Sequence, residues 1–197
     1  TAGLDVRTPA EPSNPRTRLE VERWKRQVLL RPQIEAADHV RADAPELARL
    51  AAAGVTSVLA VPPGSVVRGR SSLLNVAVPD DPPQIGNLAD ERRGRYVVKT
   101  PVALHVEFAG RAPGNAYPAS LMGVIGFVRQ AFADARHYRA ELARYGRSQG
   151  PRPVYDAALE ALEPALAGRL PVAFQADGDI PILRARAFAK EFALDPI

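Results

Sequence analysis

The sequence predicts an α/β fold built from parallel strand–helix units, and two observations support this prediction. Segments of strand-like composition alternate with segments of helical periodicity along most of the 197 residues. The clearest unit is residues 170–194, where a short apolar run ends at Gln175 and passes directly into a helix-patterned segment. The chain is long enough for one sizeable domain or for a large part of a bigger one.

The first 17 residues show no periodicity and contain three prolines separated by serine and asparagine. This composition predicts an extended arm or linker over residues 1–17, followed by a domain over residues 18–197. From Arg18 the apolar residues have partial helical spacing, and Pro32 ends that segment because proline cannot continue a helix.

The next unit is a predicted helix followed by a strand. Asp43 can accept hydrogen bonds from the first turn of a helix, and Glu46 occupies the reciprocal position of a capping box. Gly54 ends this helix. Residues 55–61 are rich in β-favouring residues and are followed by two prolines and a glycine, which predicts a buried strand.

Residues 72–78 and 96–108 are also strand-like, and the polar stretch 79–94 separates them. Pro101 interrupts the second run because it cannot donate to a strand ladder. We therefore expect two short strands, or an edge strand, within residues 96–108.

The remainder of the chain predicts three helices and one strand. The first helix follows Pro118, the second follows the loop after Gly146 and is ended by Gly168, and the third follows the strand that closes at Gln175. The apolar stripes of these helices are, in order, Leu121, Ile125, Val128 and Phe132; Leu159, Leu162 and Leu166; and Ile182, Ala185, Ala189 and Phe192.

Composition narrows the classes of function. The formal net charge is +4, but the arginines are scattered among acids and no basic run is interleaved with aromatic residues, so we expect no nucleic-acid site. The absence of cysteine excludes disulfides and thiolate metal sites. No apolar run approaches the roughly 18 residues that a membrane-spanning helix needs.

Met122 is the only methionine, so Thr1 is not an ordinary translation start. We expect the chain to be a processed product or a piece of a longer protein. Abundant alanine, arginine and proline indicate a GC-rich, bacterial genome. A removed signal peptide remains compatible with these observations, so the periplasm and the cytoplasm both stay open.

Residues 52–65 read as a strand followed by a Pro-Pro-Gly loop, residues 68–71 as the turn after it, and residues 171–194 as a strand followed by a helix. In these motifs the chain resembles the amidohydrolase superfamily, in particular its imidazolonepropionase-related branch. The resemblance covers most of the chain from about residue 31 to residue 194 and is clearest over residues 54–71 and 171–194. The resemblance implies part of a (β/α)8 TIM-like barrel of the metal-dependent hydrolase type. It also implies a divalent metal, zinc first, that activates water against an amide or cyclic amide C–N bond.

The resemblance indicates two candidate catalytic residues. Gln175 stands where the family's strand ends in a metal-binding histidine, although a neutral amide is a weak zinc ligand. Lys99 ends the strand-like run Tyr-Val-Val and resembles a lysine that often follows this strand in the family. The alternative interpretation is a strand-end lysine in a surface ion pair. Asp177 and Asp179 fit cation binding or a turn and helix cap.

The three histidines supply no metal motif. His39, His105 and His137 do not form the family's His-x-His pair, so no residue of this chain is assigned as a metal ligand. Strand alternation places His105 on the face opposite Leu104 and Val106, pointing into a cleft or out to water.

Three functions compete at this point. The first is amide hydrolysis in the intact protein, with a small amide as substrate and the missing segments supplying the metal ligands. The alternative is a non-catalytic scaffold or assembly subunit that has lost the metal site. A third hypothesis, a peptidoglycan- or polyanion-binding module, rests on the arginine surplus alone. In each case we expect the rest of the chain or another subunit to cover exposed strand edges.

Overall fold

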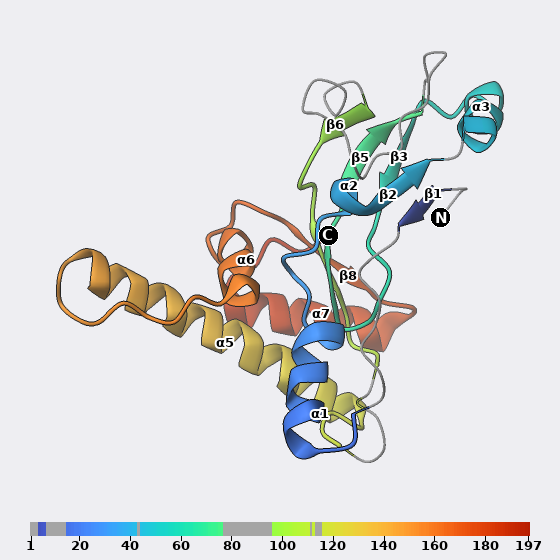
Figure 1. Cartoon of the computed structure of the whole chain (residues 1–197). Coiled ribbons are helices and arrows are strands. Elements are labelled where there is room, and N and C mark those ends of the chain that lie inside the picture. Colours follow the sequence, from blue (N-terminus) through green and yellow to red (C-terminus); the bar gives the residue numbers. More distant parts are fainter. Residues whose placement is uncertain (1–3, 7–14, 43, 77–95, 111, 113–115) are drawn as a thin grey trace.

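The computed structural model describes residues 4–6, 15–42, 44–76, 96–110, 112 and 116–197 (Figure 1). The helices are α1 (Arg18–Trp24), the π-helical segment η1 (Lys25–Leu29), α2 (Ala36–His39), α3 (Ala44–Ala52), α5 (Leu121–Gly146), α6 (Ala157–Leu166) and α7 (Asp179–Phe192). The strands are β1 (Leu4–Val6), β2 (Val40–Ala42), β3 (Ser57–Ala60), β4 (Val67–Arg70), β5 (Ser72–Asn75), β6 (Val97–Lys99), β7 (Leu104–Glu107) and β8 (Val172–Gln175).

The described strands form two three-stranded sheets and one two-stranded ribbon. The first sheet has the order β3–β5–β6, the second has the order β4–β7–β8, and β1 pairs with β2. Figure 1 shows the first sheet with α3 at one end of the molecule and α5, α6 and α7 at the other.

The predicted part of a (β/α)8 TIM-like barrel is wrong for the described residues. All strands of such a barrel are parallel, whereas β4 pairs antiparallel with β7, and β5 pairs antiparallel with β3 and β6. Among the named strands described, β7 and β8 form the one parallel pair. Parallel neighbours need a long crossover, and α5 and α6 supply it between these two strands, whereas no helix separates β3, β4 and β5.

Many of the predicted elements are confirmed. Residues 96–108 contain two short strands, β6 and β7, on either side of Pro101, and the strand over 170–175 is β8. The predicted helices are α5, α6 and α7, and most of their apolar stripes are buried, but Leu121 and Ile182 are exposed near the starts of α5 and α7. The predicted cap Asp43 and the polar stretch 79–94 lie outside the described residues, and part of the predicted arm forms β1.

The larger core lies between α5, α6, α7 and one face of the β4–β7–β8 sheet. Val67, Val106 and Val172 provide sheet side chains, and all three are fully buried. Phe188 lies at the centre, with ring centroids 5.4 Å from Phe132 and 4.9 Å from Phe192. It also packs against Phe108 and Phe174 at 5.6 and 6.1 Å. Aromatic packing therefore fixes α5 and α7 against the sheet.

A smaller core supports the other sheet. Its buried members come from β1, α2, β2, α3 and the sheet itself and include Val6, Ala36, Val40, Leu47, Leu50, Ala60, Leu74, Val76 and Tyr96. The helix α3 presents Leu47 and Leu50 to this core, so its buried apolar residues lie on one face.

A polar network joins the two sheets where β4 runs into β5. Ser72 is fully buried, accepts a hydrogen bond from the Ala37 backbone N–H at 3.0 Å and lies 2.7 Å from the Thr100 hydroxyl oxygen. The Thr100 hydroxyl donates to Glu35 at 2.7 Å, and Glu35 forms an ion pair with Arg70 at 3.3 Å. Polar groups from four segments, namely α2 with its N-cap, β4, β5 and the loop after β6, are thereby satisfied at one place.

Within the described residues, no helix has the length and apolar character required to cross a bilayer.

Replacing the central aromatic residue tests the larger core. Phe188→Ala should lower the free energy of unfolding by about 3–5 kcal/mol, because it removes a buried ring that four other rings contact. Urea denaturation followed by circular dichroism measures the loss. Ile182→Ala on the same helix is the control, because Ile182 is 54% exposed and should cost less than about 0.5 kcal/mol. Equal losses in the two variants would contradict this account of the core.

The polar network around Ser72 predicts a difference in the free energy of unfolding between two serine variants. Ser72→Ala should cost about 1–3 kcal/mol, since the buried Ala37 N–H loses its acceptor. Ser57→Ala, at an exposed position of β3, is the matched control and should stay within about 0.5 kcal/mol of the parent protein. Urea denaturation followed by circular dichroism measures both variants. An unchanged free energy of unfolding in Ser72→Ala would mean that the network does not join the sheets.

Candidate functional site

The candidate site lies at the carboxyl ends of the parallel strands β7 and β8. Glu107 closes β7, Gln175 closes β8, and the register pairs the two residues directly. Directly paired residues of neighbouring strands project to the same face of a sheet. Val106 and Val172 belong to the helix-covered core, so Glu107, Gln175 and His105 lie on the opposite face, where polar side chains collect.

Glu107 forms an ion pair with Arg68 of β4. Both side chains are largely buried, with 19% and 22% of their surfaces exposed, so each charge is neutralised in a region of reduced dielectric. The register of β4 against β7 shifts between Val67 and Gly69, which makes Arg68 the extra residue of a bulge. Val67 faces the helix-covered core, so strand alternation places Arg68 on the Glu107 side of the sheet.

A cavity of about 170 Å³ opens beside this pair. It is lined by Glu107, Phe108, Ala109, Leu121, Gln175, Asp177, Pro181 and Arg184. The lining thus combines two strand ends with the first residue of α5 and the first turns of α7. Gln175, Asp177 and Arg184 are exposed, so the cavity is open to solvent and carries an amide, a carboxylate and a guanidinium at its rim.

His105 lies on the same face of β7 as Glu107, two residues earlier in the strand. It is half-buried, and its Nε2 atom is buried without a hydrogen-bond partner in the part of the chain that the structure describes. Burial, and secondarily the Arg68 cation, lowers the pKa of His105 to about 4. The imidazole is therefore neutral at physiological pH.

The structure does not bring the two sequence-predicted catalytic residues together. Gln175 lies in the β4–β7–β8 sheet and lines the cavity, whereas Lys99 is exposed on β6, paired with Leu73 in the other sheet. Asp177 lies at the cavity rim, and Asp179 begins α7, whose N-terminus has no side-chain cap.

Gly64, in the loop after β3, and Gly69, in β4, have packing roles in this structure. A Cβ atom on Gly64 would lie 2.3 Å from the Arg31 guanidinium, and one on Gly69 would lie 2.5 Å from the Ile34 carbonyl oxygen. Both glycines have positive φ angles, 131° and 126°, which other residues rarely adopt. These positions therefore require glycine for close packing of residues 31–34.

The residues at the strand ends do not fit a zinc site. Within the described ranges, no three His, Asp or Glu side chains are arranged to hold a metal ion. Glu107 is already neutralised by Arg68, and Gln175 offers only a neutral amide. His39 is the last residue of α2 and His137 is exposed on α5, so neither lies at the ends of β7 and β8.

Sequence reasoning missed Glu107, Arg68 and Arg184. The signal for Glu107 was available, since it closes an apolar strand just as Gln175 does. Arg68 could not be found, because the sequence does not show that β4 pairs with β7.

Comparison with known proteins places this geometry in context. The sequence matches no protein-family model and no curated protein. A solved structure of an amidohydrolase from Thermotoga maritima MSB8 matches with a TM-score of 0.68 and 25% sequence identity over 85% of this chain. The fold is amidohydrolase-like. The matched region covers 42% of that amidohydrolase, so the chain corresponds to less than half of its length.

The lowered pKa of His105 predicts an acid-dependent loss of stability. Its folded value, about 4, lies below the ordinary value of 6.5, so the unfolded chain binds this proton more tightly. The contribution of neutral His105 to the free energy of unfolding is fully present above pH 6.5 and is lost as the pH falls toward 4. After allowance for solvent screening, the loss amounts to about 1–2 kcal/mol.

Urea denaturation between about pH 7 and pH 4.5 tests this prediction. His105→Asn carries no titratable group and should lose less stability than the parent protein over this range. His137→Asn on the exposed side of α5 is the control and should follow the parent curve. Parallel curves for the parent and His105→Asn would show that His105 is not buried in its neutral form.

Proposed function

We propose that the intact protein is an amidohydrolase that cleaves an amide or cyclic amide C–N bond, and that the ends of β7 and β8 bind the amide. The observation that carries the proposal is the cavity in which Gln175 and Glu107 meet beside Asp177 and Arg184. The fold similarity to an amidohydrolase supports the reaction class. The resemblance of residues 52–65 and 171–194 supports the imidazolonepropionase-related branch as the closer assignment.

Gln175 suits amide recognition. Its side chain carries one carbonyl acceptor and one NH₂ donor, so it can pair with the N–H and the C=O of a substrate amide at once. Because Glu107 is neutralised by Arg68, the cavity floor presents little net charge to a neutral amide. Arg184 has no ion-pair partner in the described ranges and can bind a carbonyl or carboxylate group of the substrate.

The divalent metal implied by the resemblance, zinc first, needs ligands that the described residues do not provide. If the intact protein holds one, its ligands come from other residues of the polypeptide. The role proposed for the described chain is therefore to bind and orient the substrate, with Gln175 as a binding residue. Lys99 has no place in this role because it lies on the other sheet.

A second candidate function is a non-catalytic scaffold or assembly subunit. The specific observation in its favour is the neutralised strand end, where an ion pair and an amide stand in place of metal-binding side chains. Such a protein would bind its partner without turning over an amide.

Kinetics of the intact protein test the first candidate. A panel of linear and cyclic amides is assayed with added zinc, cobalt or manganese. For the best substrate, Gln175→Ala should raise KM about tenfold and change kcat less than about threefold, because two neutral hydrogen bonds to the bound amide are lost. Gln149→Ala, an exposed residue of the loop after α5, is the control and should leave both constants unchanged.

The outcomes separate the candidates. Turnover with an unchanged KM in Gln175→Ala would keep the hydrolase and remove Gln175 from its substrate site. No turnover of any amide with any of the three metals, together with a stable complex with another subunit in native mass spectrometry, would overturn the hydrolase in favour of the scaffold.

A further inference from the structure

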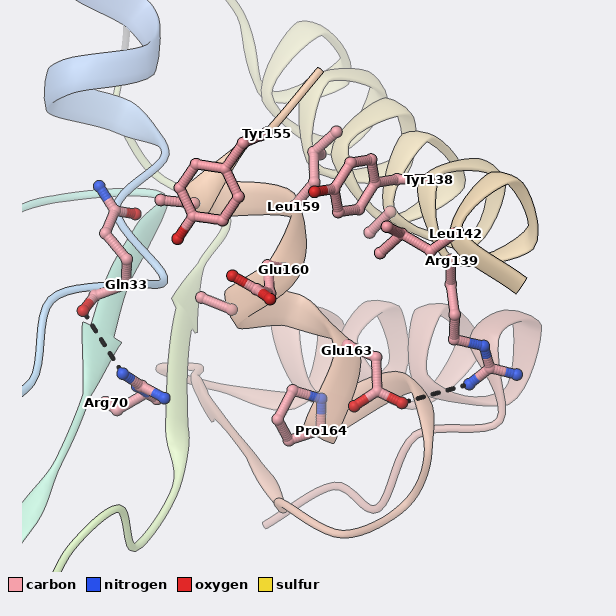
Figure 2. Close-up of a pocket in the computed structure, with 13 residues that line it drawn as sticks. Gln33, Arg70, Tyr138, Arg139, Leu142, Tyr155, Leu159, Glu160, Glu163 and Pro164 are labelled. Atoms are coloured by element: carbon pink, nitrogen blue, oxygen red, sulfur yellow. Dashed lines mark hydrogen bonds and ion pairs between the residues drawn. The ribbon is translucent and has the colours of Figure 1, made fainter. Parts of the chain in front are cut away.

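A second cavity lies where α5 and α6 pack beside Gln33 and Arg70. It has a volume of about 550 Å³, within the range of small-molecule sites. Its lining comes from α5, from α6 and the residues before it, and from Gln33 and Arg70 at the sheet (Figure 2). The proposed amide site shares no residue with it.

Short side chains keep the cavity open. Ala135 on α5 and Ala157 and Ala161 on α6 line it where the two helices pack, and larger residues there would fill the space. Arg70 is held toward the sheet by Glu35 at 3.3 Å, and its guanidinium also donates to the Gln33 carbonyl at 3.5 Å. The wall on the sheet side is therefore fixed by the network that joins the two sheets.

The two cations that line the cavity are already paired. Glu35 neutralises Arg70, and Glu163 lies 3.8 Å from Arg139 (Figure 2). Glu163 also forms an ion pair with Arg169. An anionic ligand would have to compete with these carboxylates, so the cavity does not favour one.

Glu160 is the charged lining residue for which the described part of the chain gives no ion-pair partner. Its carboxylate interacts with the nearby Tyr155 hydroxyl, and this interaction is the main reason that the pKa of Tyr155 is raised. Glu160 lies in the first turn of α6, where the helix dipole favours a negative charge.

Two aromatic rings accompany this carboxylate. Figure 2 shows Tyr155 and Tyr138 on the same side of the opening, with Glu160 extending into the space beside them. Tyr138 is 8% exposed and is held by α5, whereas Tyr155 is 66% exposed and can adjust to a ligand. Aromatic faces and a carboxylate together attract cations, and Leu142 and Leu159 add apolar wall.

We propose that this cavity binds a small organic cation, an ammonium or guanidinium group carried on an apolar body. The charged group pairs with the Glu160 carboxylate, and the apolar body lies against the rings of Tyr138 and Tyr155. The proposal does not depend on the amide site, and it adds a second ligand site to the protein.

Isothermal titration calorimetry of the full chain with benzylammonium chloride tests the proposal. Benzyl alcohol is the neutral probe of the same shape, and benzoate is the anionic one. Benzylammonium should bind at least about tenfold more tightly than either, because the contact with Glu160 is charge-assisted. Tighter binding of benzoate would overturn the proposal by showing that the arginines attract the ligand, and equal binding of all three would overturn it as well.

Single-residue variants test whether benzylammonium binds in this cavity. Glu160→Gln should weaken benzylammonium binding about tenfold, and Tyr155→Leu should weaken it about threefold or more. Glu191→Gln removes the same charge from α7, away from the cavity, and should leave binding unchanged. Circular dichroism confirms that each variant is folded. Binding that survives both Glu160→Gln and Tyr155→Leu, or that falls equally in Glu191→Gln, would overturn the assignment to this cavity.

Discussion

The passage of the chain from β4 into β5 is the constraint on which the rest of the structure depends. One residue, Ser71, separates the two strands, yet they belong to different sheets with different cores. Both serines at this crossing, Ser71 and Ser72, are fully buried, and each hydrogen-bonds a neighbouring segment. A buried polar crossing is tolerated only if its groups are satisfied. The network through Thr100, Glu35 and Arg70 meets that requirement and sets the position of one sheet against the other.

The β4–β7–β8 sheet carries a different chemistry on each face because strand residues alternate. On one face, valines from all three strands meet the phenylalanines of α5 and α7, and the packing of these rings fixes the helices. On the other face, the polar residues Glu107 and Gln175 meet at the strand ends. The ion pair of Arg68 with Glu107 leaves the floor of the strand-end cavity without a free charge, and the proposed binding of a neutral amide rests on this feature. The second cavity, which Glu160 lines, has Arg70 of β4 in its wall, and the ion pair with Glu35 fixes the position of Arg70.

Much of the local structure could be predicted from the sequence. The interruption at Pro101 separates β6 from β7, the apolar stripe from Leu121 lies on α5, and the apolar run closing at Gln175 is β8. In each case the signal lies within a few neighbouring residues: the fixed backbone of proline, the helical period, or a β-favouring run. The sheet arrangement could not be predicted, because strand–helix alternation suggested parallel pairing throughout, whereas β4 and β7 pair antiparallel.

The candidate site was likewise predictable from the sequence only in part. By itself the sequence determined that Gln175 closes a strand, that its amide is a poor zinc ligand, and that the histidines form no His-x-His pair. Only the tertiary structure decided that Glu107 lies beside Gln175, that Arg68 neutralises it, and that Lys99 belongs to another sheet. The physical reason is distance along the chain. Strand periodicity is local, whereas pairing, burial and charge neutralisation depend on segments tens of residues apart that meet only after the two cores have formed.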